Sequence, residues 1–276
     1  MRNFVFIILS FFLFYSCNNR DDIGHVFIKV KGGTFALGSD STETNFTHTI
    51  TIADFEIAET ETTNEQFELF VNATGYVTDA EKKGYAKVFR ENLPEWEWEL
   101  CKGACWKYPF GPNNDGAENK RNHPVTQISA ADAKAYCEWL GARLPTLDEW
   151  EVAGRAGVKT LYPWGNSLKI NDKYLANTWQ GKDHKDNLKE DGFLFTSPIK
   201  SFPPNKIGLY DIIGNVFEYC SNEIKEIDEN DTTIYTTGRG GSWWCSTNSC
   251  NYLNLLERGQ MPFHESICNQ GFRVAK

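Results

Sequence analysis

RGGSWWCSTNSC, residues 239–250, places two cysteines, Cys245 and Cys250, five positions apart near the end of the chain. That separation puts side chains on opposite faces of a strand and well round the barrel of a helix, so the sulfurs converge only where the backbone reverses. The residues between them, Ser-Thr-Asn-Ser, have short polar side chains that bond their own backbone in turns. The stretch therefore predicts a turn carrying two thiols, which can form a disulfide, hold a soft metal or perform redox chemistry.

The first residues indicate export. Residues 4–15 are almost wholly apolar after a single positive charge, and this run is too short to span a bilayer as a mature helix. Ser16 and Cys17 then resemble a bacterial lipoprotein cleavage box, with a plain secretion signal as the alternative. We expect a signal peptide over 1–16, a linker over 17–25, and an exported protein in the cell envelope, periplasm or outer surface, lipid-anchored at Cys17.

Composition limits the possible partners and core of the remaining chain, for which we predict a single domain over 26–276. A net charge of -9 argues against nucleic acid and against anionic membrane surfaces as partners, which leaves the N-terminal lipid as the expected membrane contact. Nine Trp, eleven Tyr and nineteen Phe predict an aromatic-rich core. We find neither an internal repeat nor a second apolar run long enough to cross a membrane.

Regular structure is predicted to be sparse. Asn64 is a candidate N-cap, and the capping-box spacing occurs at Ser129 and at Thr146, so we expect helices that end near the glycines at 75, 141 and 157. Apolar residues at 50, 52, 55 and 57 change phase, as in a strand with a bulge. Residues 162–221 show turns and aromatics without periodicity, so bound ions or aromatic packing should order them.

Hard oxygen ligands cluster in this irregular segment. Asn177 and Asp191 lie in the runs LANTWQG and KEDGFLF, and Asp211 and Glu218 lie in YDIIGNVFE. Calcium favours carboxylate, amide and backbone oxygens presented by flexible loops, although acidic loop residues are more often simply solvated. These four side chains are candidate calcium ligands.

The eight cysteines would normally form disulfides in an exported chain. If lipid consumes Cys17, seven remain and at least one thiol is unpaired. Cys101 and Cys105 are close enough in sequence to pair, and Cys137 is a candidate core thiol on a predicted helix. Cys220 and Cys268 have no assignment.

The thiols at 245 and 250 leave several chemistries open. Zinc would require four ligands, and His264 is the only imidazole nearby in the sequence. Two thiolates alone suit copper(I), while an ordinary disulfide is the more common outcome in an oxidising compartment. The five histidines are scattered, and the sequence has neither a GxSxG nor an HExxH motif. It therefore gives little support for a hydrolase.

From residue 30 to residue 276 the chain resembles the formylglycine-generating enzymes, also called sulfatase-modifying factors. The matching runs, in order, are VKGGTFALGSD, KGACWKYPFGP, HPVTQISAADAKAYCEWLGARLPTLDEWE, YPWGN, ANTWQG, EDGFLFTSP, NKIGLYDIIGNVFEYCS, RGGSWWC and NQGFRVA. The resemblance implies an α+β fold with little regular secondary structure, the formylglycine-generating-enzyme fold, related to C-type lectin-like domains.

The resemblance also implies a set of site residues. Cys245 and Cys250 would be the copper(I) ligands, and Ser242 would line the active site. Two Ca2+ sites would use side-chain oxygens together with backbone oxygens. The first would comprise Asn177, Thr178, Asp191 and Phe193, and the second Asp211, Gly214, Val216 and Glu218.

The chain departs from the family pattern beside the cysteines. The family commonly has His after the first catalytic cysteine and Tyr before the second, where this chain has Ser246 and Ser249. Two disulfides of some members also lack partners: Ala153 and Leu255 replace one pair, and Val274 leaves Cys137 without its mate.

Two functions of different classes follow from these observations. The first is a copper-dependent oxidase that uses dioxygen to convert a cysteine in a Cys-x-Pro-x-Arg segment of an exported sulfatase to Cα-formylglycine. The substrate thiol would bind copper(I) as a third sulfur. The alternative is a non-catalytic envelope lipoprotein that uses the same fold as a binding or assembly module. Tight copper(I) binding by the two thiols favours the oxidase, and a permanent disulfide favours the module.

Overall fold

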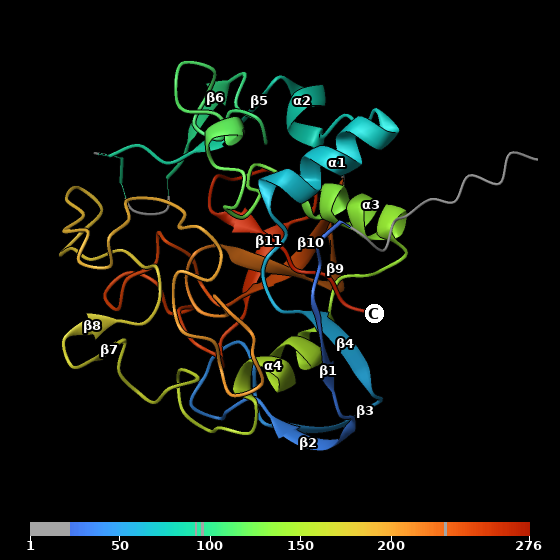
Figure 1. Ribbon diagram of the computed structural model, residues 1–276, viewed down its shortest axis with the longest axis vertical. Coiled ribbons are helices and arrows are strands. Elements are labelled where there is room, and N and C mark those ends of the chain that lie inside the picture. Colours follow the sequence, from blue (N-terminus) through green and yellow to red (C-terminus); the bar gives the residue numbers. More distant parts are fainter. Residues whose placement is uncertain (1–22, 92, 95–96, 229–230) are drawn as a thin grey trace, which may run out of the picture.

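The helices begin and end at local sequence signals (Figure 1). A computed structural model describes residues 23–91, 93–94, 97–228 and 231–276. The helices are α1 (Asn64–Thr74), α2 (Asp79–Lys83), α3 (Ala130–Leu140), α4 (Leu147–Arg155) and the short 3-10 helix η2 (Ala117–Asn119). The capping boxes expected at Ser129 and Thr146 are confirmed, since each hydroxyl accepts a hydrogen bond from the backbone N–H three residues later, at 3.1 and 3.2 Å.

The N-cap expected at Asn64 is wrong by one residue. Thr63 has the extended backbone of an N-cap, its hydroxyl accepts from Gln66 N at 3.2 Å, and the Gln66 side chain accepts from Thr63 N at 2.9 Å. Asn64 is the first helical residue, and its amide donates to the carbonyl of Lys120 instead. Thr63 is the N-cap because Gln66, three positions later, completes a reciprocal capping box with it.

The strands form one sheet of four strands and four pairs of strands. The large sheet has the order β11-β10-β9-β12, in which β9 and β12 run parallel and the other neighbours antiparallel. Its strands are β9 (Phe217–Asp228), β10 (Asp231–Arg239), β11 (Gly259–Pro262) and β12 (Gln270–Gly271). The antiparallel pairs join β1 (Phe27–Val30) to β4 (Phe55–Ala58), β2 (Gly33–Leu37) to β3 (His48–Ile52), β5 (Tyr85–Val88) to β6 (Glu99–Lys102), and β7 (Lys169–Ile170) to β8 (Lys173–Tyr174).

The change of phase between residues 52 and 55 does not mark a bulge, as expected from the sequence, but a change of sheet. β3 ends at Ile52 and pairs with β2, whereas β4 begins at Phe55 and pairs with β1. The Asp54 carboxylate accepts a hydrogen bond from Gly32 N at 2.9 Å, which fixes the crossing. A Cβ on Gly32 would lie 2.4 Å from the carbonyl oxygen of Ile52, so this close approach of two backbones requires glycine.

The layers place the irregular segment to one side of the large sheet. In Figure 1, α1 and α3 lie side by side above the sheet and α4 lies below it, while the segment around β7 and β8 runs along the left edge with little regular structure. The lack of periodicity predicted for residues 162–221 is confirmed up to residue 216, apart from the two-residue strands β7 and β8, and is wrong for the last five residues, which begin β9. Aromatic side chains dominate the core between these parts, and the largest fully buried ones are Trp150, Trp243, Trp244, Tyr136, Tyr219, Phe67 and Phe272.

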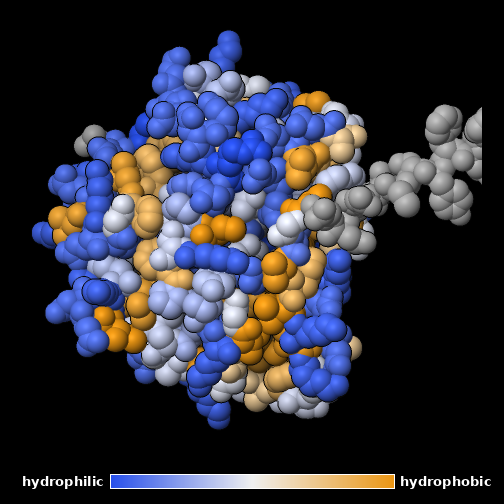
Figure 2. Space-filling view, in the orientation of Figure 1, coloured by the Kyte–Doolittle hydropathy of each residue, from blue (hydrophilic) through white to orange (hydrophobic). Residues whose placement is uncertain are grey.

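The face drawn in Figure 2 is largely polar and carries an apolar hollow over α4, β1 and β2. Val30, Phe35, Leu37, Val152 and Ile207 line this hollow, which has a volume of about 260 Å³. Within the part of the chain that the structure describes, no helix combines the length and apolar character needed to cross a bilayer. The predicted signal segment, the lipidated Cys17 and most of the predicted linker lie outside the described residues.

Candidate functional site

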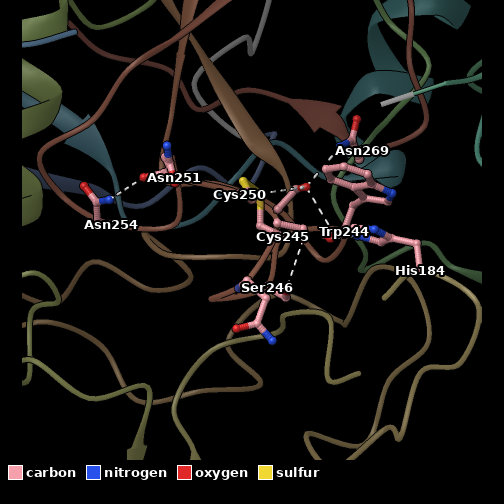
Figure 3. The surroundings of a disulfide bond; sticks show 11 residues. His184, Trp244, Cys245, Ser246, Cys250, Asn251, Asn254 and Asn269 are labelled. Atoms are coloured by element: carbon pink, nitrogen blue, oxygen red, sulfur yellow. Dashed lines mark hydrogen bonds between the residues drawn. A yellow bond between two sulfur atoms is a disulfide. The ribbon is translucent and has the colours of Figure 1, made fainter. Parts of the chain in front are cut away.

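The cysteine loop, Cys245–Cys250, reverses the chain as its sequence predicts (Figure 3). The two Cα atoms are 5.0 Å apart and the sulfurs form a disulfide. The carbonyl of Ser246 accepts hydrogen bonds from the backbone N–H of Cys250 at 3.2 Å and of Ser249 at 3.4 Å, and the hydroxyl of Ser246 accepts from Asn248 N at 3.2 Å. The backbone carbonyl of Ser246 thus closes the turn, and the Ser246 hydroxyl supports it. Among the chemistries left open by the sequence, the structure holds the oxidised pair.

Ser242 lies directly against this loop, as the resemblance implies. Its side chain is fully buried, and its hydroxyl oxygen is 4.0 Å from the sulfur of Cys245. That oxygen accepts hydrogen bonds from the Asn269 amide at 3.0 Å and from Trp244 N at 3.3 Å. With two donors already on its oxygen, the hydroxyl hydrogen is left to point at sulfur. The sequence did not single out Asn269, although it lies in the matching run NQGFRVA.

Aromatic rings enclose the apolar side of the site. The Phe195 ring meets Trp243 edge-on at 5.0 Å and stacks on Phe110 at 4.1 Å between centroids. On the other side, the half-buried Trp98 lies 5.6 Å from Trp244. Trp243 and Trp244, on which these rings pack, directly precede the buried Cys245, so the packing holds the start of the cysteine loop in place.

The histidine beside the cysteines is His184 and not His264, the imidazole that is nearest in the sequence. The ring of His184 stacks on Trp244 at 3.8 Å with an interplanar angle of 5°, and its Nε2 is 2.7 Å from the Trp244 carbonyl oxygen (Figure 3). His264 instead contacts Asp79 at 2.9 Å. Sequence reasoning missed His184 because sixty residues, including strands β9 and β10, separate it from Trp244, and no local signal joins the two positions.

The residues of the first predicted calcium set lie together. The Asp191 carboxylate accepts from Thr178 N at 2.8 Å and from Phe193 N at 2.9 Å. Asn177 is almost fully buried and donates through its amide to Phe195 O and to Asn215 Oδ1, while its Oδ1 has no hydrogen-bond partner among the described residues. An orphaned buried amide oxygen beside a carboxylate fits a hard cation.

In the second predicted calcium set, the Glu218 carboxylate pairs with the buried guanidinium of Arg273. Glu218 accepts from Arg273 at 2.5 and 2.6 Å and from the Trp150 indole at 2.7 Å, so its charge is already balanced. Asp211 accepts from Lys200 N at 2.7 Å through one oxygen, while its buried Oδ1 has no partner within the described ranges. This set therefore fits calcium through Asp211 more readily than through Glu218.

Gly214 and Asn215 connect the two sets. Asn215 N donates to the Asn177 carbonyl at 2.9 Å, and a Cβ on Gly214 would lie 2.2 Å from that same oxygen. Gly214 has φ +80°, which also favours glycine. The neighbouring backbone at Val216 is buried. The Asn215 amide reaches on to Glu61 at 2.8 Å, a fully buried carboxyl that the sequence reading missed.

The buried carboxyls of this region resist ionisation. Burial raises the pKa of Asp211 to about 7, and it raises that of Glu61 well above its ordinary value, with Asp211 and Glu218 adding repulsion. Burial also raises the pKa of Asp191, although backbone N–H donors oppose that shift. A divalent cation held nearby would reverse the sign of these effects.

A metal at the cysteine loop would have to rely on sulfur. Across residues 23–91, 93–94, 97–228 and 231–276, no group of three or more His, Cys, Asp or Glu side chains is placed to hold a metal ion. The two sulfurs are buried and convergent, and once reduced they supply the soft, low-coordinate donor set that suits copper(I). The donor chemistry therefore fits copper(I) and does not fit zinc.

The remaining described cysteines are unpaired. Cys101 and Cys105 do not bond to each other as their spacing suggested: the Cys101 sulfur accepts from Arg90 at 3.6 Å, while Cys105 packs in a small buried cluster with Val88 and alanines. Cys137 is a buried core thiol, as expected from its helix, and Cys220 and Cys268 are buried too. Burial raises the pKa of Cys268 to about 12, so this thiol is inert at neutral pH.

Comparison with known proteins shows the family of this chain. A family model for the sulfatase-modifying factor enzyme 1-like domain matches residues 17–276. The chain is 37% identical over 277 residues to the formylglycine-generating enzyme of Mus musculus, which spans 90% of this chain and 74% of that protein. It is 34% identical over 286 residues to the formylglycine-generating enzyme of Thermomonospora curvata, with 92% and 94% covered. It is also 36% identical over 271 residues to the inactive C-alpha-formylglycine-generating enzyme 2 of Bos taurus, with 90% and 88% covered.

Solved structures bear out the predicted fold with little regular secondary structure, while its relation to C-type lectin-like domains stays a prediction. PvdO from Pseudomonas aeruginosa superimposes with a TM-score of 0.63 at 21% identity, covering 90% of this chain and 93% of that one. CarF gives a TM-score of 0.59 at 21% identity, covering 92% and 98%. At this identity the likeness concerns the fold alone. With the family model and the curated relatives, it shows that this chain belongs to the sulfatase-modifying factor family, which includes the formylglycine-generating enzymes.

Proposed function

We propose that this protein is a copper-dependent oxidase that uses dioxygen to convert a cysteine in a Cys-x-Pro-x-Arg segment of an exported sulfatase to Cα-formylglycine. The observation that carries the proposal is the convergence of Cys245 and Cys250 beside the buried hydroxyl of Ser242. Relatives named formylglycine-generating enzyme, at 34–37% identity, support this class of chemistry.

The residues of this chain prepare the site for that chemistry. Copper(I), held by the thiolates of Cys245 and Cys250, would supply the one-electron chemistry toward dioxygen that side chains lack. Ser242 directs its hydroxyl at the Cys245 sulfur and stabilises the thiolate form. The Asn269 amide holds that hydroxyl in place, and the aromatic rings hold the start of the cysteine loop.

The overall reaction sets a requirement for electrons. Converting a –CH2–SH group to an aldehyde consumes one water, releases hydrogen sulfide and removes two electrons. Reduction of dioxygen to two waters takes four electrons, so two more must come from a thiol reductant, which becomes a disulfide. The Cys245–Cys250 disulfide must also be reduced before the loop can hold copper, again by a thiol.

We also propose that calcium stabilises the irregular segment. The first site would use the side chains of Asn177 and Asp191 with the backbone oxygens of Thr178 and Phe193. The second would use Asp211 and Glu218 with the backbone oxygens of Gly214 and Val216. The orphaned buried oxygens of Asn177 and Asp211 support this proposal. The role would be charge balance and cross-linking of distant loops, with no part in oxidation.

The test of the oxidase is direct. The reduced protein is loaded with copper(I), mixed in air with a thiol reductant and a peptide containing Cys-x-Pro-x-Arg, and the products are read by mass spectrometry. We expect an aldehyde product that Cys245→Ser and Cys250→Ser abolish and that Cys137→Ser, which removes a buried thiol elsewhere, preserves. Absence of aldehyde at every copper loading contradicts the proposal. A disulfide that resists mild reductant would then indicate the non-catalytic module.

For the compartment, we propose export and lipid attachment at Cys17, as the first residues predict. Cys17→Ala should release the protein from the membrane fraction and prevent incorporation of a labelled fatty acid. Unchanged fractionation of that variant would contradict the anchor.

A further inference from the structure

We propose that His184 is a positioning residue for Cys245, and that it stabilises the closed arrangement of the two sulfurs through the peptide bond before Cys245. His184 is 4% exposed and its Nε2 lies 2.7 Å from the Trp244 carbonyl. Because a carbonyl only accepts, Nε2 carries the hydrogen and donates it. The same ring stacks on the Trp244 indole at 3.8 Å (Figure 3).

The peptide unit between Trp244 and Cys245 is held at both of its ends. Its carbonyl accepts from His184, and its N–H, on Cys245, donates to the Ser242 carbonyl at 2.9 Å. The plane of this peptide unit is therefore fixed on the N-terminal side of the Cys245 Cα.

The next peptide unit is held as well. The carbonyl of Cys245 accepts from Trp179 N at 2.9 Å. With the planes on both sides of its Cα fixed, the backbone dihedrals of Cys245 are fixed, and so is the direction of its Cα–Cβ bond. Among these three hydrogen bonds, the one to the Trp244 carbonyl comes from a side chain and can be removed by substitution.

The ring of His184 is itself fixed by packing. It lies 5.1 Å from the Trp179 ring and 6.1 Å from the Phe89 ring, between centroids, in addition to the stack on Trp244. A donor held by several aromatic neighbours acts on the carbonyl with little conformational freedom of its own. His184 thus connects the aromatic wall to the Cys245 backbone.

The consequence is a change in the chemistry of the sulfur pair. A Cys245 sulfur held in one direction meets the Cys250 sulfur at a high effective concentration, which favours the closed pair over two separate thiols. Loss of the His184 donor should shift the thiol–disulfide equilibrium of this pair toward the thiols by about tenfold, or about 30 mV for a two-electron couple.

The experiment measures that equilibrium in the full chain. The protein is equilibrated in buffers of reduced and oxidised glutathione, free thiols are trapped by alkylation, and the state of Cys245 and Cys250 is read by peptide mass spectrometry. We expect His184→Phe, which keeps a stacking ring without the donor, to shift the equilibrium by about tenfold. His184→Gln, which restores a donor without the ring, should return the equilibrium most of the way to the wild-type value. Comparing these two variants keeps the test decisive if His184→Ala fails to fold.

The matched control is His25→Ala. The ring of His25 also hydrogen-bonds, to the Tyr136 hydroxyl at 2.8 Å, and packs against the rings of Phe27 and Tyr136, which lie outside the cysteine loop. This variant should lower the melting temperature and leave the glutathione equilibrium unchanged. If His184→Phe is folded and shifts the equilibrium by less than twofold, or if His184→Gln behaves like His184→Phe, the positioning role is refuted.

A second readout rests on the proposed function. In the peptide assay, His184→Phe should lower kcat while KM for the peptide changes by less than twofold, because the residue acts through Cys245 and is buried away from the peptide. If the wild-type protein forms no aldehyde, the proposed function fails, and the glutathione equilibrium still decides the role of His184.

Discussion

The cysteine loop and the polar cluster beside it are both buried, but they are stabilised in different ways. The polar cluster comprises Glu61, Asn177, Asp211, Asn215, Glu218 and Arg273. Backbone hydrogen bonds and aromatic rings hold the cysteine loop, and its sulfurs can change between disulfide and neutral thiols without leaving a buried charge. In the cluster, ionisable groups hold one another, so each member depends on the others for its charge balance.

This difference separates chemistry from stability. A change of one side chain in the loop alters the sulfurs and leaves the core packed, whereas the same change in the cluster leaves a buried polar group without a partner. We therefore expect loop variants to lose activity before stability, and cluster variants to lose stability before activity.

The largest effect is expected at Arg273. Arg273→Met leaves the buried Glu218 carboxylate without its cation, and breaking such a pair costs about 3–5 kcal/mol in the free energy of unfolding. Urea denaturation measures this loss. Arg121→Met is the control: Arg121 is exposed and pairs with Glu65 and Glu68, so its loss should leave the free energy of unfolding nearly unchanged.

A double variant tests whether the charge itself is responsible. Glu218→Gln combined with Arg273→Met removes both members, and it should be less destabilised than Arg273→Met alone. An Arg273→Met protein as stable as the wild type would show that the cluster does not depend on its internal charge balance.

The second effect concerns calcium, which would make the cluster dependent on an external cation. Excess EGTA should lower the melting temperature, since a ligand present at a hundredfold its Kd stabilises the folded state by about 2.7 kcal/mol. Asp191→Ala and Glu218→Ala should each abolish part of the chelator effect while retaining copper binding. Asp186→Ala, an exposed acid of the same segment, is the control.

Metal analysis provides the opposing outcome for calcium. A melting curve unchanged by EGTA, together with no calcium in the purified protein, would mean that these carboxylates are balanced by Arg273 and by protonation alone.

The two regions also differ in how far their sequence predicts them. The cysteine loop is local: four residues of turn-forming composition were enough to predict the reversal that joins Cys245 and Cys250. The capping boxes of α3 and α4 were readable for the same reason, because each signal lies within four residues. Family resemblance then added Ser242, which lies against the loop.

What the sequence did not predict depends on contacts between distant segments. Glu61, Asn215 and Arg273 meet from three parts of the chain, and nothing local marks Glu61 as a buried acid. His184 lies in an irregular segment and meets Trp244 from sixty residues away, across strands β9 and β10, so no local pattern marks the contact. The sequence predicted a bulge after Ile52 where the structure has a change of sheet. This error has the same origin, since strand partners are set by tertiary packing.

Mild acid should destabilise the protein through His25, which lies outside both regions. Burial, with Lys276 adding repulsion, lowers the pKa of His25 from 6.5 to about 4. The unfolded chain therefore binds the proton first, so this stability is present above pH 6.5 and is lost as the pH falls toward 4. Between pH 7 and pH 5 the loss is about 2 kcal/mol.

His25→Gln should remove the His25 share of this pH dependence in urea titrations, and the rest should persist because burial also lowers the pKa of His123 to about 4. The cysteine loop serves as the internal comparison, because the extent of its disulfide in glutathione buffer should follow thiol chemistry and not this titration. An acid dependence that is the same in His25→Gln would assign it to other groups.

The smallest effect is expected at Ser249, on the rim of the cysteine loop. Its hydroxyl is 2.8 Å from that of Ser246, and the side chain is partly exposed, so water can replace the lost hydrogen bond. Ser249→Ala should change the free energy of unfolding by less than about 0.5 kcal/mol. The disulfide should also be unaffected, because the turn is closed by the Ser246 carbonyl and not by this hydroxyl.

Ser249→Tyr, which introduces the residue common in the family, extends the same test toward activity. The tyrosine ring at the rim can reach a bound peptide without entering the core. We therefore expect a change in KM for the peptide with an unchanged melting temperature. Urea unfolding and the peptide assay measure the two quantities on the same preparation. A loss above about 1.5 kcal/mol in Ser249→Ala would mean that the rim belongs to the stabilised core, and the contrast between the cysteine loop and the polar cluster would not hold.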